Sequence, residues 1–99
     1  MFNYLIKIEY EGTNFVGWQS QKNGKSIQDS VEKALTRVLR TRIRIIGSGR
    51  TDKGVHALSQ YANFKTKIKI NEKKIFLNSM NFFLKKKCIS ILDIKIFYS

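Results

Sequence analysis

The chain has 99 residues with one cysteine, and 19 Lys and Arg against 7 Asp and Glu give it a formal net charge of +12. This length allows one domain with a single core, and one cysteine excludes a disulfide scaffold and a multi-cysteine zinc site. No apolar run approaches the roughly 20 residues of a membrane span, and the start lacks the long apolar stretch of a signal peptide. We therefore expect a soluble, basic protein of the cytoplasm.

The first half of the chain predicts a strand, a helix and a second strand. Residues 4–10 alternate apolar and other side chains with a period of two, which is typical of a half-buried strand. Ser26 can cap a helix with Asp29, and apolar residues then recur at helical spacing as far as Leu39. Residues 42–46 predict a short strand that directs its arginines to one face and its isoleucines to the other.

The second half predicts a loop, a strand, a helix and a last strand. Residues 47–54 contain three glycines, and residues 58–66 alternate again. Asn71 is expected to cap a helix that ends at 85–87, where three lysines complement the helix dipole. The apolar stripe predicted to enter the core consists of Phe76, Met80, Phe83 and Leu84. Residues 89–97 are mostly apolar and predict a strand.

The predicted order is therefore β-α-β-β-α-β. This order is the ferredoxin-like pattern of α+β proteins, an antiparallel sheet with two helices on one face. We expect residues 1–99 to form a single domain. Cys88, directly before the last strand, is expected to be a small core residue.

The basic charge has two interpretations. Lysine supplies 14 of the 19 cations, which is compatible with a merely solvated basic surface. The alternative is a footprint for a polyanion, most simply nucleic acid. Arginine is more informative because its planar fork suits phosphates. The four clustered arginines that could hold the phosphates of such a partner are Arg37, Arg40, Arg42 and Arg44.

Asp52 is the main candidate for chemistry, because it lies in the glycine-rich loop between two strands. If Arg50, Lys53 and His56 face it, they favour the ionised carboxylate, which can act as a nucleophile or a general base. The alternative is an ordinary turn, in which aspartate is common. No metal site is expected, because the single histidine and the single cysteine have no acidic cluster near them.

Residues 49–57 read Gly-Arg-Thr-Asp-Lys-Gly-Val-His-Ala and resemble the catalytic motif of the tRNA pseudouridine synthase A family. Residues 10–19 resemble the family's opening strand and loop, and residues 26–35 are similar to its first helix. The resemblance covers essentially the whole chain. Lys53 stands where the family usually has a small residue. Family members are well over twice as long, so we expect the chain to correspond to their N-terminal half and to lack the C-terminal half.

The resemblance implies an isomerase that converts uridine to pseudouridine in the anticodon stem-loop of tRNA by intramolecular transfer. Asp52 would be the essential carboxylate. The implied substrate-binding residues are Gly49, Arg50, Thr51, Lys53, His56, Trp18 and Gln19. No cofactor, metal or membrane is implied, and the full-length protein is expected to be a homodimer. Whether the 99-residue chain is active by itself, or is an inactive truncated form, stays open.

Two other functions fit the same topology. One is a non-catalytic RNA-binding module, although residues 59–64 do not fit the aromatic-rich strand of an RNA-recognition motif. The other is a small acylphosphatase-like hydrolase. That family needs an arginine in its first glycine loop, and residues 12–18 contain none.

Overall fold

The computed structural model describes residues 1–10, 26–47 and 58–96. The elements are β1 (Phe2–Tyr10), α1 (Ile27–Leu39), β2 (Ile45–Gly47), β3 (Leu58–Thr66), α2 (Lys73–Leu84), the 3-10 helix η2 (Lys85–Lys87) and β4 (Ile89–Ile96). The predicted order of strands and helices is confirmed.

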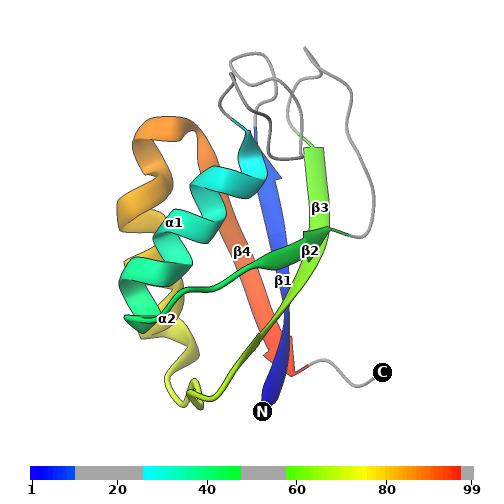
Figure 1. The fold of residues 1–99 in the computed structure, drawn as a ribbon. Coiled ribbons are helices and arrows are strands. Elements are labelled where there is room, and N and C mark those ends of the chain that lie inside the picture. Colours follow the sequence, from blue (N-terminus) through cyan, green and yellow to red (C-terminus); the bar gives the residue numbers. More distant parts are fainter. Residues whose placement is uncertain (11–25, 48–57, 97–99) are drawn as a thin grey trace.

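The four strands form one sheet in the order β2-β3-β1-β4, and every neighbouring pair is antiparallel. Both helices lie on the same face of this sheet, with α1 and α2 side by side (Figure 1). This arrangement is the ferredoxin-like α+β fold, so the predicted fold class is confirmed.

The core lies between the helices and the inner face of the sheet, as the alternation along β1 predicts. Tyr4, Ile6 and Ile8 are at most 3% exposed, whereas Glu9 on the opposite face is exposed. Burial of an isoleucine side chain stabilises a fold by about 1.5–3 kcal/mol. The period of two along the central strand therefore determines which face of the sheet carries the helices.

Helix α1 begins where the sequence places its cap. The Ser26 hydroxyl oxygen accepts a hydrogen bond from the Asp29 backbone N–H at 3.0 Å, which satisfies one of the free donors of the first turn. The helix ends at Arg40, which adopts a left-handed conformation with φ of 56°. Its buried apolar stripe consists of Ile27, Val31, Ala34, Leu35 and Leu39.

Three predictions around α2 and β4 are wrong in detail. The helix cap is Glu72 rather than Asn71, and the Phe76 N–H bonds to the Glu72 carbonyl at 3.0 Å. Phe83 is 37% exposed, because the buried stripe follows every fourth residue and ends at Leu84. Cys88 is exposed rather than in the core, since it forms the left-handed end of η2 with φ of 59°.

The strand predicted over residues 42–46 begins later, because in the described part of the chain only Ile45–Gly47 pair with β3. Before them, the Ile43 N–H donates to the Thr36 hydroxyl of α1 at 3.3 Å rather than to a neighbouring strand. The predicted faces are nevertheless confirmed, since Ile43 and Ile45 are buried while Arg42 and Arg44 are exposed.

A β-bulge interrupts the pairing of β4 with β1. Ile91 pairs with Ile8 and Asp93 pairs with Lys7, so Leu92 has no partner across the strands. The extra residue allows Ile91 and Ile94, three positions apart, to be buried on the same face. The bulge therefore allows two residues an odd number of positions apart to face the same side of a strand whose side chains otherwise alternate.

The outer edge of β4 is held by a side chain of α2. The Asn81 amide accepts a hydrogen bond from the Ile91 N–H at 2.7 Å and donates one to the Ile91 carbonyl at 3.0 Å. Further along, the Asp93 carboxylate pairs with Lys73 and accepts from the Ile94 N–H at 2.9 Å. The hydrogen bond from Lys73, with that from Ile94, lowers the pKa of Asp93 below its ordinary value.

Candidate functional site

The described residues next to segments 11–25 and 48–57, which contain most of the predicted site residues, include Tyr10 and Leu58 at one end of the sheet and Gly47 beside the middle of β3. Tyr10, the last residue of β1, pairs with Leu58, the first residue of β3. Gly47, the last residue of β2, pairs with Ala62 of β3. The fold therefore brings the residues that flank these two segments together on three adjacent strands.

A buried hydrogen bond holds β1 and β3 together at this end. The Tyr10 hydroxyl donates to the Gln60 side-chain oxygen at 3.0 Å, and the two residues are 2% and 7% exposed. A buried polar pair of this kind must keep its geometry, because leaving either group without a partner costs about 1–3 kcal/mol. The bond therefore fixes where the first segment leaves the sheet and the second returns to it.

Two side chains of α1 hold β2 at its first residue. The Glu32 Oε2 atom accepts from the Ile45 N–H at 2.9 Å, and the Gln28 amide donates to the Ile45 carbonyl at 3.3 Å. The Gln28 amide also lies 3.2 Å from Glu32 Oε2. We call the side chains of Gln28 and Glu32 with the backbone of Ile45 the Ile45 clamp. Glu32 is 14% exposed at its side chain, so the carboxylate is largely withdrawn from water.

The sequence reasoning missed this clamp. Gln28 and Glu32 are four residues apart, so they share one side of α1, adjacent to the apolar stripe. A glutamine and a glutamate at this spacing beside a buried stripe are a signal for polar contacts with a neighbouring strand. The apolar stripe of α1 and the cations on its opposite face do not by themselves indicate such contacts.

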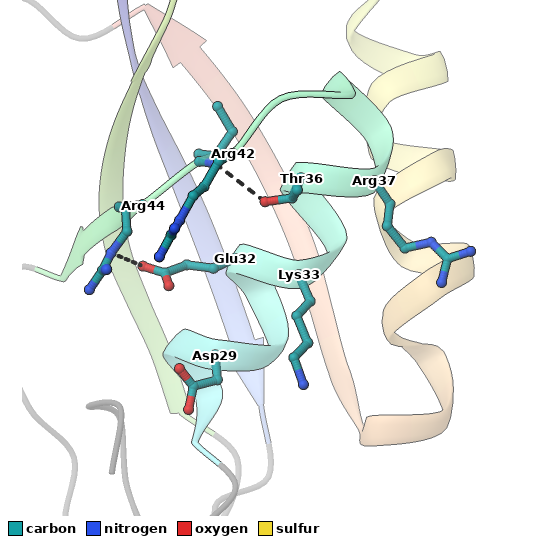
Figure 2. Close-up of a pocket in the computed structure, with 8 residues that line it drawn as sticks. Asp29, Glu32, Lys33, Thr36, Arg37, Arg42 and Arg44 are labelled. Atoms are coloured by element: carbon teal, nitrogen blue, oxygen red, sulfur yellow. Dashed lines mark hydrogen bonds and ion pairs between the residues drawn. The ribbon is translucent and has the colours of Figure 1, made fainter. Parts of the chain in front are cut away.

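A groove of about 560 Å³ runs between α1 and residues 42–44. Its lining residues are Asp29, Glu32, Lys33, Thr36, Arg37, Arg42, Ile43 and Arg44. Figure 2 shows Arg42 and Arg44 extending toward Glu32, with the Arg44 Nε atom 3.8 Å from the carboxylate. Four cations against two carboxylates give the groove a net positive charge.

The predicted phosphate contacts are therefore only partly brought together. Arg37, Arg42 and Arg44 line the groove, but Arg37 extends toward α2 and its guanidinium lies 5.0 Å from the centre of the Phe83 ring (Figure 2). Arg40 ends α1 and does not line it. Arg42 also lines a second hollow of about 310 Å³ with Lys65 and Lys67.

The other predicted site residues lie outside the described residues. They are Trp18, Gln19, Gly49, Arg50, Thr51, Asp52, Lys53 and His56. Among the described residues, no group of three or more His, Cys, Asp or Glu side chains could hold a metal ion. Neither described helix is long and apolar enough to cross a membrane.

The chain was compared with known families and proteins. The family model described as tRNA pseudouridine synthase matches residues 6–93. The chain belongs to this family. The match runs from the middle of β1 into β4 and includes the sequence from Gly49 to Ala57, so the resemblance seen in the sequence is confirmed.

Individual tRNA pseudouridine synthases A are similar over most of the chain. The protein of Pelagibacter ubique is 50% identical over 95 residues, which cover 96% of this chain and 39% of that relative. The protein of Caldicellulosiruptor saccharolyticus is 50% identical over 82 residues, and that of Aquifex aeolicus is 44% identical over 86 residues. The chain spans 34% to 39% of the length of these three synthases.

Proposed function

We propose that this chain carries the catalytic loop of a tRNA pseudouridine synthase, an isomerase that converts uridine in tRNA to pseudouridine. The observation that carries the proposal is the family match over residues 6–93, a range that includes Asp52. The anchoring of segments 11–25 and 48–57 on adjacent strands supports it, because a two-segment site needs its flanks held together.

The chemistry requires one well-placed carboxylate. The C1′–N1 glycosidic bond breaks and a C1′–C5 bond forms, while C5 loses a proton and N1 gains one, so no oxidant or reductant is needed. Asp52 either attacks C1′ or removes a proton from the sugar. Both roles resemble glycoside cleavage, in which a carboxylate faces positive charge that develops on the sugar.

The neighbours of Asp52 are proposed to bind the uridine. Arg50 pairs with the carboxylate and assists in moving the base out of the helical stack, a step that costs a few kcal/mol. The remaining proposed pocket residues are Gly49, Thr51, Lys53, His56, Trp18 and Gln19. The proposed reaction uses no metal or cofactor.

The proposed substrate region is the anticodon stem-loop of tRNA. Arg42 and Arg44 are exposed on the positively charged groove, where they can contact backbone phosphates, and Arg37 and Arg40 are proposed for the same role. Such contacts supply affinity and position the RNA without choosing a uridine. The full-length protein is proposed to act as a homodimer in the cytoplasm.

Release of tritium from tRNA labelled at C5 of uridine tests the proposal. The chain is assayed alone and in a chimera in which it replaces the matched segment of the Pelagibacter ubique synthase. We expect Asp52→Ala to abolish release while tRNA binding, measured by filter retention, stays within about twofold. Asp93→Ala is the matched control, because Asp93 is an aspartate of β4 rather than of the loop.

Each outcome discriminates between functions. Activity that survives in Asp52→Ala, or its absence from both wild-type forms, contradicts the proposal. Binding of tRNA without tritium release by either form supports the RNA-binding module instead. Hydrolysis of an acyl phosphate by the purified chain would support the hydrolase.

A further inference from the structure

Two side chains of α1 provide hydrogen-bond partners for the backbone N–H and carbonyl of Ile45, on the side of β2 that faces away from β3. The Ile45 clamp provides an acceptor for its N–H at 2.9 Å and a donor for its carbonyl at 3.3 Å. The Gln28 amide also donates a hydrogen bond to Glu32, so the two side chains of the clamp contact each other as well as Ile45. Both polar groups of this residue are thus held from a helix 13 to 17 positions earlier in the chain.

The clamp acts in a largely dry environment. Ile45 is 3% exposed and the Glu32 side chain 14%. A hydrogen bond from a backbone N–H to an ionised carboxylate is roughly twice as strong as one between neutral groups. Arg44 approaches the same carboxylate from the solvent side, with 67% of its own side chain exposed. The hydrogen bond to the backbone therefore contributes more than the ion pair.

The strand that the clamp holds has few other restraints. Among the described residues, β2 has three residues and pairs only with β3, at Ile45–Gly47. These three described residues form few ladder hydrogen bonds, so side-chain bonds from α1 are a large part of what fixes their position. β2 ends at Gly47, five residues before Asp52.

We propose that Gln28 and Glu32 are positioning residues for the catalytic carboxylate, which they serve by fixing the strand that leads into its loop. This inference rests on the proposed function of Asp52. Neither residue needs to touch the uridine, because both act through the backbone of Ile45. A misplacement of about 1 Å at a reacting group can lower a rate about 100-fold, so a small movement of β2 is sufficient to matter.

Amide hydrogen exchange of the 99-residue chain tests the first half of this inference without any activity. Glu32→Ala should accelerate exchange at Ile45–Gly47 and leave Ile91 unchanged. Asn81→Ala is the matched control, since it removes the corresponding side chain at the other edge strand and should accelerate exchange at Ile91 only. If the exchange rate at Ile45 is unchanged in Glu32→Ala, the clamp does not hold β2 and the inference is wrong.

Steady-state kinetics of the active form, the chain or the chimera, test the second half. Glu32→Ala should lower kcat about 10- to 100-fold with KM within about twofold, because orientation is lost rather than RNA binding. Glu32→Gln keeps an acceptor oxygen for the Ile45 N–H and should restore kcat to within about threefold. Asn81→Ala should leave kcat within about twofold at a temperature where all variants are folded.

The results separate this inference from the function on which it rests. If the wild-type chain and chimera form no pseudouridine, the proposed function is wrong, and so is the positioning role that rests on it. Hydrogen exchange would still show whether the clamp holds β2. If the wild type is active, three results overturn the positioning role alone: an unchanged kcat in Glu32→Ala, an equal loss in Asn81→Ala, or an effect on KM only.

Discussion

The two edge strands of the sheet are held in similar ways with different chemistry. Each is preceded by a helix, α1 before β2 and α2 before β4. Each of these helices binds both backbone polar groups of one isoleucine, Ile45 or Ile91. At Ile91 a single neutral amide, that of Asn81, is donor and acceptor. At Ile45 the two tasks are divided between Gln28 and Glu32.

The difference shows what a charged partner adds. A neutral amide satisfies an edge strand without burying charge, and it occupies backbone groups that could otherwise pair with another chain. A carboxylate does the same for the N–H and also attracts Arg44. β2 is thereby linked to the positively charged groove, whereas the contact at β4 only closes an edge.

The largest expected effect comes from removing the neutral amide. Asn81→Ala should lower the free energy of unfolding by about 1–3 kcal/mol, because both backbone groups of Ile91 lose their partner. Gln28→Ala should lower the free energy of unfolding by less, because the Ile45 N–H keeps its hydrogen bond to Glu32. Urea denaturation measures both, with Asn78→Ala, exposed on the same helix, as the control. Equal losses in the first two variants would show that the edges are not held differently.

The turn that leads into each edge strand provides a second comparison. Arg40 ends α1 with φ of 56° and Cys88 ends η2 with φ of 59°, and this left-handed conformation favours glycine. Arg40→Gly and Cys88→Gly should each raise the free energy of unfolding by up to about 1 kcal/mol. Alanine at either position is the control and should give no gain. A glycine variant no more stable than its alanine counterpart would contradict this prediction.

Removal of the cation beside the clamp should have a smaller effect. Arg44→Ala should lower the free energy of unfolding by less than about 1 kcal/mol, because the arginine is two-thirds exposed and the pair is separated by 3.8 Å. The effect should shrink as salt is raised in thermal or urea unfolding. Arg42→Ala, two residues earlier, serves as the comparison. A loss as large as that of Asn81→Ala would mean that the charge, not the backbone bond, holds β2.

The smallest effect concerns pH at the β4 edge. The hydrogen bond from Lys73, with that from the Ile94 N–H, lowers the pKa of Asp93 in the folded state. The carboxylate therefore stabilises the fold above its unfolded pKa of about 4, and this contribution is lost as pH falls through and below that value. Asp93→Asn should flatten the dependence of the urea midpoint on pH below about 5.

A reciprocal variant checks the assignment to this ion pair. Lys73→Met removes the hydrogen bond that contributes most to the lowered pKa of Asp93 and should reduce the same pH dependence. If the wild type and both variants lose stability in parallel as the pH falls, other carboxylates account for the acid response.

The alternation of side chains predicted the sheet well because it has a direct physical cause. The inward residues of β1, with Ala62 and Phe64 of β3, provide the apolar surface on which the helices pack, and the serine before α1 must supply an acceptor. The same logic gave the faces of Arg42 and Arg44 correctly. The family match confirmed a resemblance that rested on the nine residues from Gly49 to Ala57 and on residues spread along the chain.

Other features depend on contacts between distant residues, which periodicity does not contain. Residues 42–44 are predicted to be part of a strand, yet the Ile43 N–H donates to the Thr36 hydroxyl of α1. Cys88 precedes an apolar strand, but the reversal after η2 requires a left-handed residue at that point. To predict the Ile45 clamp, one would need to know which strand lies beside α1, and the periodicity of side chains carries no such information.

The bulge at Leu92 has a consequence for how this sequence can vary. In a strand, the parity of a residue's position decides whether it faces the helices or the opposite side, and Leu92 is the place where that parity changes. Because Leu92 is the additional residue, its deletion would leave Ile91 and Ile94 two positions apart on the same face, with Asp93 still opposite Lys7. The number of residues here can therefore fall by one without turning a carboxylate into the core, and we expect a β4 that lacks Leu92 to pair with β1 as an uninterrupted ladder.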